Sequence, residues 1–283
     1  MDIKKIAQVL KSAFKFTTFA TDASGNVKGL ILPNGSIQYS PIRISSGISS
    51  SSLSASSINA RILPACAAST TVSQSTTAVT VINGGAGPTA HNIPATTYDG
   101  FQVFFPGSPS IAAGWYGGFT RTSTTAYTFN AASATVASES VNSGAAYATE
   151  TTAMSVTIPG GLLGATGEML IFGSTGANNT ANAKLLKIKF ATIIFAQQSL
   201  LSGTFQDFSA SIKNLTAQIQ RRINGGVNAN SAAFFGGLSG ASGAHDQQAI
   251  DTTDNQTLSI TMTVGTANDF LVLISPSIWL MPS

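Results

Sequence analysis

Alternation of apolar and polar side chains is the main pattern in the second half of the chain. It is clearest at 257–264 and recurs at 184–190, where Lys187 and Lys189 are predicted to point outward. The inward residues are Leu258, Ile260, Met262 and Val264 in the first run and Leu186, Ile188 and Phe190 in the second. Because successive side chains of a strand point to opposite faces, both runs predict half-buried β-strands.

Short β-rich runs recur between turn signals from about residue 86 onward. The clearest of them are 101–105, 168–172, 214–223 and 270–274. This part of the sequence has no convincing long helical pattern, so it predicts a mainly β fold. The expected architecture is a β-sandwich, with the jelly roll as the favoured form.

The N-terminal segment, 1–45, has a different pattern. Apolar residues recur there at spacings of three and four, which predicts a short amphipathic helix. The residues on this stripe are Ile3, Ile6, Leu10 and Ala13, and the predicted anchoring residues are Ile3, Ile6, Leu10 and Phe14. Such a helix would form a bundle with sister chains, lie on a host surface or cap its own domain. Turn signals on both sides of Val27–Leu32 then predict a small hairpin.

Two stretches, 45–60 and 68–81, are rich in serine and threonine. This composition is typical of a linker, or of a thin shaft if three chains associate. The predicted domains follow from these patterns. They are an anchoring segment (1–45), a linker or shaft (46–85), a small β domain (86–152) and a C-terminal β-sandwich (153–283).

Charge is sparse and unevenly distributed. Charged residues make up 9% of the chain, against roughly 25% in an average soluble protein. Hydroxyl and amide groups fill the polar positions instead, and they are less costly than charges to bury between chains. We therefore expect a surface covered by copies of the same chain. The net charge of +3 is concentrated before residue 62, and it is too small to predict a nucleic-acid partner.

The cysteine count and the hydropathy of the chain argue against disulfides, cysteine metal clusters, a signal peptide and membrane spans. Cys66 is the single cysteine, so neither an intrachain disulfide nor a cysteine metal cluster can form. The first twenty residues have scattered lysines and do not resemble a signal peptide. No stretch approaches the ~20 apolar residues of a membrane span, so we expect no membrane insertion.

The glycine-rich run PGGLLGATGE, at 159–168, raises the question of a phosphate site. A P-loop requires lysine and serine or threonine after its last glycine, whereas Glu168 follows Gly167 here. The dinucleotide fingerprint precedes a helix, whereas this run leads into a strand-like segment. The glycines are therefore predicted to supply positive-φ turns between two strands, and no cofactor is expected.

Other residues that could catalyse a reaction or bind a metal do not form a recognisable motif. Ser239, Ser242, His245 and Asp246 invite comparison with a catalytic triad, but they lie in one glycine-rich loop without a nucleophile elbow. The two histidines, His91 and His245, are far apart and do not predict a zinc site. Asp246, Asp251 and Asp254 could ligate calcium, yet they lack the spacing of a calcium loop and are expected to be solvated.

Two further groups suggest contact with carbohydrate. Glu139, Glu150 and Glu168 could pair across a groove as glycosidase carboxylates, although no pattern supports this directly. Aromatic residues concentrate in 101–119, and exposed aromatics are common in sugar-binding surfaces. The candidate glycan contacts are Trp115, Tyr116 and Phe119. The alternative is that these rings form the core of a small β domain.

Several segments resemble virion proteins of tailed bacteriophages. The run 99–129, with PGSPS and AGWY, is similar to a segment of such proteins. The runs 158–190, 208–226 and 250–274 resemble the C-terminal domains of phage fibre and head-decoration proteins. The shared features are the glycine loop, an ANN turn before a lysine-containing strand and the ending DTxxxQxLxI. Together they cover roughly the last two thirds of the chain.

This resemblance implies a homotrimer with C-terminal β-sandwiches around a threefold axis and the N-terminus anchored in the virion. The expected partners are other virion proteins, with a host-surface glycan as a further candidate. The resemblance carries over no catalytic residue, so we expect a structural protein and not an enzyme. Tail fibre is favoured over head fibre, and a carbohydrate-active virion enzyme is the remaining alternative.

Overall fold

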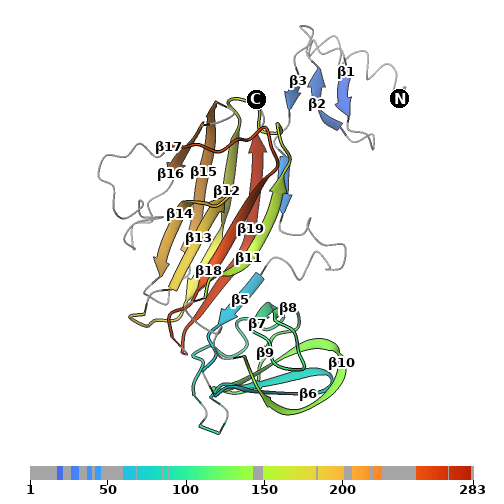
Figure 1. Ribbon diagram of the computed structural model, residues 1–283, viewed down its shortest axis with the longest axis vertical. Helices are drawn as coiled ribbons and strands as arrows, with labels where there is room; N and C mark the ends of the chain where they lie inside the picture. Colours follow the sequence, from blue (N-terminus) through green and yellow to red (C-terminus); the bar gives the residue numbers. More distant parts are fainter. Residues whose placement is uncertain are drawn as a thin grey trace, which may run out of the picture.

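The computed structural model consists of β-strands and the turns that join them (Figure 1). It describes residues 18–21, 27–31, 37–39, 42–45, 60–67, 69–84, 86–87, 89–142, 149–182, 184–200, 206–216, 219–224, 247–266 and 268–281. No helix occurs among these residues. The predicted mainly β fold is therefore confirmed. The predicted N-terminal helix and its anchoring residues Ile3, Ile6, Leu10 and Phe14 lie outside the described residues.

The N-terminal segment contributes a small antiparallel sheet. Its strands are β1 (Thr18–Thr21), β2 (Val27–Ile31) and β3 (Ile37–Tyr39), in the order β1-β2-β3. Residues 27–31 of the apolar run thus pair on both sides, and the predicted hairpin is confirmed.

Two larger sheets form a β-sandwich. The four-stranded sheet has the order β11-β18-β13-β14, and its strands are β11 (Thr151–Ile158), β18 (Gln256–Thr263), β13 (Lys184–Phe190) and β14 (Ile193–Leu200). The nine-stranded sheet has the order β17-β16-β15-β12-β19-β5-β7-β8, with β4 also paired to β19. Its strands are β17 (Gln247–Gln248), β16 (Ile219–Asn224), β15 (Gln206–Thr216), β12 (Glu168–Ala177), β19 (Phe270–Met281), β5 (Ala60–Pro64), β7 (Gln102–Phe105), β8 (Gly114–Tyr116) and β4 (Ile42–Ser45).

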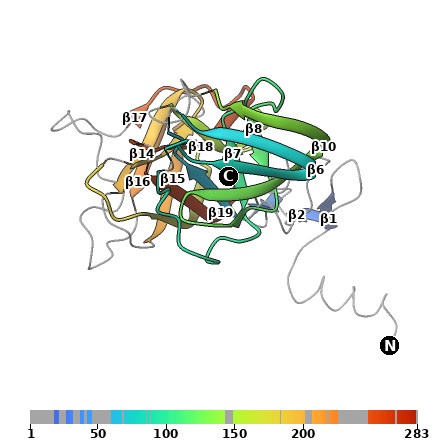
Figure 2. The same cartoon turned by 90° about the horizontal axis from the view of Figure 1, so that it is seen from below.

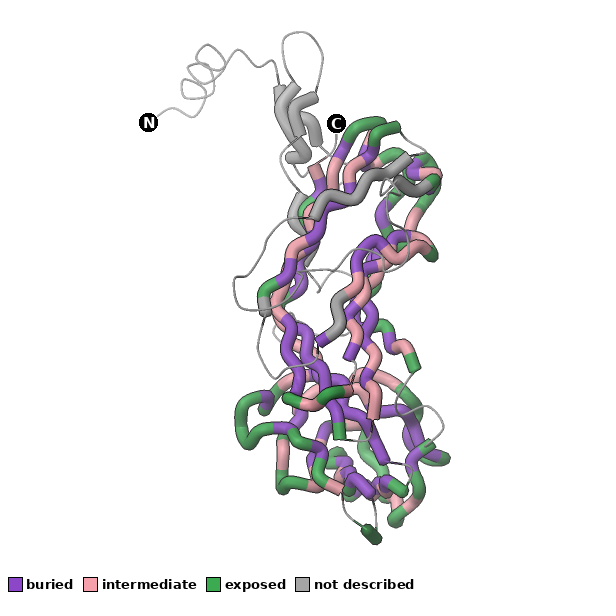
Figure 3. Tube along the Cα trace, turned by 90° about the vertical axis from the view of Figure 1, so that its left-hand side faces the viewer, coloured by how far each residue is buried: buried purple, intermediate pink, exposed green. Residues whose placement is uncertain are grey.

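The core of the sandwich confirms the predicted alternation. The inward residues of β13 and β18, Leu186, Ile188, Phe190, Leu258, Ile260 and Met262, are all buried. They face Met169 and Ile171 of β12 and Ile212 of β15 in one apolar cluster. Buried positions follow the facing strands along the molecule in Figure 3. Full burial of each such side chain contributes about 1.5–3 kcal/mol, so this alternation is the main sequence signal that specifies the sandwich.

A small β domain lies at one end of the sandwich (Figure 1). Its sheet has the order β6-β10-β9, with strands β6 (Thr71–Ile82), β10 (Ala126–Ser140) and β9 (Thr120–Arg121). The strands β6 and β10 run side by side as a long ribbon, seen from below in Figure 2.

The prediction of a linker or shaft over 46–85 is wrong for its second half. Residues 60–64 form β5 and 71–82 form β6, so the small domain begins well before residue 86. Threonine and valine favour strands because their branched side chains fit a pleated surface. Val72, Val79 and Val81 are buried in the core of the small domain, while the serines and threonines between them remain more exposed.

The two domains share one segment of the large sheet. Along β5 and β19, Leu63, Leu271 and Leu273 belong to the sandwich core. The alternate residues Ile62, Phe270 and Val272 belong to the core of the small domain. Both faces of this segment are therefore covered, which explains why 270–274 is continuously apolar and does not alternate.

Candidate functional site

Trp115 joins the small domain to the sandwich. Its indole Nε1 donates a hydrogen bond of 2.9 Å to the main-chain oxygen of Thr152, at the start of β11. The Arg61 guanidinium lies 5.0 Å from the centre of the indole ring, and the Phe104 ring packs against it in an edge arrangement at 5.4 Å. One ring face is thus occupied by a cation–π contact. This arrangement favours a structural role for Trp115 over stacking on a sugar.

The other two aromatic candidates belong to the small domain. Tyr116 is half-buried, donates its hydroxyl to the oxygen of Ala112 at 2.8 Å and packs on Phe129 at 4.8 Å. Phe119 is fully buried beside Tyr127. The prediction of Phe119 as a glycan contact is therefore wrong, because none of its ring surface reaches solvent. The core interpretation of this aromatic segment is correct for Phe119.

The glycine-rich run at 159–168 is a turn between the two sheets. It connects β11 in the smaller sheet to β12 in the larger one. Gly161 and Gly164 have φ values of 74° and 67°, a left-handed conformation that glycine adopts without a steric penalty. A side chain at Gly167 would overlap the Leu163 carbonyl oxygen. The predicted positive-φ turn is confirmed for Gly161 and Gly164, whereas Gly160 and Gly167 have ordinary φ values and are required by close contacts with neighbouring backbone.

The three candidate glycosidase carboxylates have separate structural partners. Glu139 accepts hydrogen bonds from the main-chain N–H and the hydroxyl of Ser110, at 3.0 and 2.9 Å. Glu168 accepts a hydrogen bond from Ser211 on the neighbouring strand β15. Glu150 forms ion pairs with Lys187, at 2.7 Å, and with Lys189. Each carboxylate therefore forms a contact between two segments that are distant in the sequence, and it acts in stabilising the fold.

The electrostatics of Glu150 do not suit an acid catalyst. Partial burial on its own would raise the pKa of Glu150, but hydrogen bonds from Lys187 and Lys189 outweigh it and lower the pKa to about 2. A general acid in glycoside hydrolysis needs a raised pKa, so that it carries a proton near neutral pH. Glu150 is ionised there and acts as a clamp on the two outward lysines of β13.

The other reactive groups provide no assembled site in the described part of the chain. Asp251 accepts hydrogen bonds from the N–H and hydroxyl of Thr253, at 2.9 and 2.6 Å, and Asp254 is exposed. No cluster of three metal-ligating side chains occurs among the described residues. His91 is buried in the small domain. The segment with Ser239, Ser242, His245 and Asp246 lies outside the described residues.

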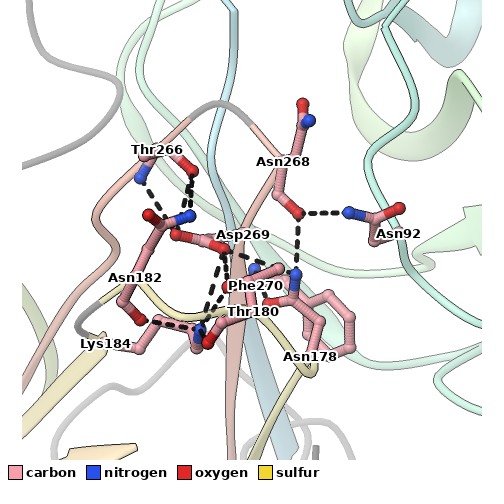
Figure 4. Close-up of polar contacts among 9 residues, drawn as sticks. All are labelled: Asn92, Asn178, Thr180, Asn182, Lys184, Thr266, Asn268, Asp269 and Phe270. Carbon is pink, nitrogen blue, oxygen red and sulfur yellow. Dashed lines mark hydrogen bonds and ion pairs between the residues drawn. The ribbon is translucent and has the colours of Figure 1, made fainter. Parts of the chain in front are cut away.

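A buried ion pair lies where the small domain meets the sandwich (Figure 4). The Nζ of Lys184 is 3.7 Å from Oδ1 of Asp269, and neither side chain is accessible to solvent. Burial would raise the pKa of Asp269, yet hydrogen bonds from Thr180 and the charge of Lys184 outweigh it, so the pKa is lowered. Burial also lowers the pKa of Lys184, against the opposing charge of Asp269, and several hydrogen bonds compensate both groups for the loss of hydration.

The remaining partners of this pair are polar residues of the surrounding loops. Lys184 donates to the Thr180 hydroxyl at 2.7 Å and to the Asn182 oxygen at 2.9 Å. Asp269 accepts from the Thr180 hydroxyl at 2.6 Å and from the N–H and hydroxyl of Thr266 at 3.0 and 3.1 Å. The network therefore fixes the loop between β12 and β13 against the turn before β19.

The main-chain oxygen of Asn268 connects this network to the small domain. It accepts a hydrogen bond of 2.9 Å from Nδ2 of Asn178 and one of 3.0 Å from Nδ2 of Asn92. Asn178 is further held by the N–H of Phe270, which donates to its Oδ1 at 3.0 Å. Figure 4 shows the two amide nitrogens converging on this oxygen, with the Asn92 oxygen turned away from it.

A pocket of about 420 Å³ opens at the same junction. The small domain contributes Asn92, Thr97 and Tyr98 to its lining. The loop after β12 contributes Asn179, and β19 contributes Phe270, whose ring packs in the core of the small domain. The sequence analysis did not identify this site. Its residues are separated along the chain and belong to no motif, although the inward position of Lys184 in the alternation of 184–190 does indicate a buried ionic network.

Comparisons with known proteins leave the family open. No family model matches the chain, and no curated protein and no solved structure matches it significantly. Within the described residues, no helix has the length and apolar character needed to cross a membrane. The resemblance to phage virion proteins therefore stays a prediction based on the sequence segments described above.

Proposed function

We propose that the protein is a non-enzymatic structural fibre of a tailed-phage virion. In this proposal the N-terminal segment docks on the particle and the β domains project outward. The chain forms a homotrimer through jelly-roll-like sandwiches, and the fibre belongs to the tail, where it contacts the host surface.

The observation that carries the proposal is the end-to-end arrangement of the two β domains. They share β5 and β19, so the small domain continues the large sheet along the long axis (Figure 1). A continuous sheet keeps two domains in a fixed relation, which a flexible linker does not. A rigid, elongated β body suits a part that projects from a particle.

The sparse charge supports the same proposal. Only 9% of the residues are charged. Of the ion pairs described above, Lys184 with Asp269 is fully buried, and Glu150 with two lysines of β13 is partly buried. Polar surface without charge can be covered by another subunit at low desolvation cost. Light scattering of the purified chain tests this. A trimer at micromolar concentration is expected, and a monomer would contradict the assembly.

The competing function is a carbohydrate-active virion enzyme. It predicts release of reducing ends when the purified protein is incubated with host envelope polysaccharide. Glu150, clamped by two lysines with a pKa of about 2, does not favour this alternative. Sustained release of reducing ends, abolished by Glu139→Gln or Glu168→Gln, would replace the structural proposal.

Electron microscopy of purified virions tests the proposed location. Antibodies against residues 160–283 should label the tail, and particles treated with preimmune serum provide the control. Label over the head would instead favour a head fibre or capsid decoration protein. Particles that carry no label would contradict a virion role and return attention to the enzyme.

A further inference from the structure

We propose that the pocket at the junction of the two domains binds a neutral saccharide unit of a cell-surface glycan. This inference rests on the proposed function as a host-contacting fibre and specifies the ligand class and the residues. It also moves the predicted glycan contact away from Trp115, whose indole is engaged by Arg61 and Thr152.

The size and position of the pocket suit a small ligand. Its volume of about 420 Å³ falls within the ~300–1,000 Å³ typical of ligand sites, which occur preferentially at domain interfaces. The junction is also built firmly, because Asn92 and Asn178 from the two domains share the oxygen of Asn268. The pocket is thus fixed by the fold and needs little reorganisation to bind.

The chemistry of the lining favours neutral, hydroxyl-rich ligands. The described residues that line the pocket include no charged side chain. Three exposed residues supply the polar groups: the amide of Asn179, the amide oxygen of Asn92, whose nitrogen donates to Asn268, and the hydroxyl of Thr97, which also donates to the Ala95 oxygen at 3.3 Å. An amide both donates and accepts hydrogen bonds, as do the hydroxyl groups of a sugar. Pro94, which is exposed, supplies apolar surface for the carbon face of a sugar ring, whereas Tyr98 and Phe270, whose rings pack at 5.6 Å, are buried and offer no stacking face.

A charged ligand fits this pocket poorly. The nearest charges of the junction network, Lys184 and Asp269, are fully buried and do not line the pocket, and Lys184 also donates to Thr180 and Asn182. Neither charge is therefore exposed to neutralise a phosphate, a uronic acid or an amino sugar. Burying such a group without a counter-charge carries a desolvation penalty. We expect discrimination in favour of neutral sugars.

Backbone strain next to the pocket supports a binding role. Asn92 and Thr96 have φ values of 56° and 59°. Asparagine adopts this left-handed conformation readily, but it is strained for β-branched Thr96, and such strain is often found at ligand sites. The loop at 92–97 is held in this form by its contact with Asn268 on the sandwich side.

The test uses the full-length protein on an array of neutral and charged bacterial surface glycans, with free neutral monosaccharides measured in parallel by saturation-transfer NMR. We expect binding to neutral glycans on the array. Binding of the monosaccharides as well would place the recognition in one sugar unit, whereas binding of the array glycans alone would assign it to an extended glycan. Either result supports the proposal.

Two near-isosteric variants locate the site. Asn179→Leu removes an exposed amide and Thr97→Val removes an exposed hydroxyl, and each should weaken binding at least tenfold. Asn142→Leu and Thr135→Val make the same changes at exposed positions outside the pocket and should bind as the parent does. Circular dichroism confirms the folding of each variant.

Three results would overturn the proposal: no binding to any neutral glycan, equal binding by parent and pocket variants, or loss of binding in Trp115→Phe alone. A fibre that labels on the tail but binds no neutral glycan would remove this inference and leave the proposed function standing. Glycan binding by a protein that antibodies do not find on virions would support this inference and contradict the proposed function.

Discussion

The indole N–H of Trp115 in the small domain donates to the main-chain oxygen of Thr152 in the sandwich, over 2.9 Å. This contact joins β8 in the large sheet to β11 in the smaller sheet. The small domain is thus connected to both layers of the sandwich and not only to the sheet that it extends.

Trp115→Phe should loosen this junction. The variant keeps an aromatic ring beside Arg61 and Phe104 but removes the hydrogen bond, which should cost about 1 kcal/mol of unfolding free energy. Faster hydrogen exchange of the β11 amides is the expected readout. Tyr116→Phe removes a hydrogen bond within the small domain and should leave exchange in β11 unchanged. Equal exchange in all three proteins would show that Trp115 does not couple the domains.

The buried ion pair predicts a large and non-additive effect. Lys184→Met leaves Asp269 charged, buried and without its cation, which should destabilise the fold by about 3–5 kcal/mol. Lys184→Met combined with Asp269→Asn should lose less than the sum of the single changes, because the two groups interact. Urea unfolding measures both effects. Asp254→Asn, on an exposed loop, is the control and should change stability by less than about 0.5 kcal/mol.

The ion pairs of Glu150 with Lys187 and Lys189 predict that the protein loses stability as the pH falls. The pKa of Glu150 is about 2 in the folded protein, below the 4.5 of a free glutamate. Its contribution to stability is therefore complete above pH 4.5 and is lost as the pH falls toward 2. Because the group is partly exposed to solvent, we expect a contribution of about 1–2 kcal/mol.

The comparison with Glu150→Gln isolates this contribution. The variant should be less stable than the parent at pH 7, and the difference between the two should shrink as the pH falls from 4.5 to 2. Thermal melting over this range measures it. A difference that stays constant with pH would show that the two lysines do not stabilise the charged form of Glu150.

Gly167→Ala should destabilise the turn between β11 and β12. Its methyl group would overlap the Leu163 carbonyl oxygen, and the necessary backbone shift should cost about 1–3 kcal/mol. Gly117→Ala is the matched control, since a methyl group there meets no atom within 4 Å. Thermal melting should separate the two variants, and equal melting temperatures would contradict a close-packed turn.

The sandwich could be predicted from the sequence wherever one sheet face is buried and the other is exposed. In 184–190 the alternation identifies both the strand and its inward face. In 71–82 the same signal is weak, because valines occur only toward the two ends, Val72 at one and Val79 and Val81 at the other, and the middle of the strand is exposed. The composition therefore indicated a linker, although the threonines there favour a strand.

The candidate site could not be predicted because it depends on contacts between distant segments. Lys184 shares the inward face of Leu186 and Ile188, so its burial follows from the alternation, but nothing local identifies Asp269 as its partner. Asn92 and Asn178 likewise meet only through the oxygen of Asn268. Amides and hydroxyls of this kind are common in the chain and become distinctive only once the fold brings them together.

The strand pair β5–β19, which lies between the two cores, has a mechanical consequence. Its alternate side chains belong to different cores. Separating the domains would therefore break the hydrophobic contacts on one face of each strand while the other face stays packed in its own core. The register pairs Phe270 with Pro64 through Ile274 with Ala60, and β19 runs along the long axis (Figure 1). A pull along that axis loads these hydrogen bonds together, in shear. The junction should therefore resist extension as one unit and rupture in a single step, without first stretching.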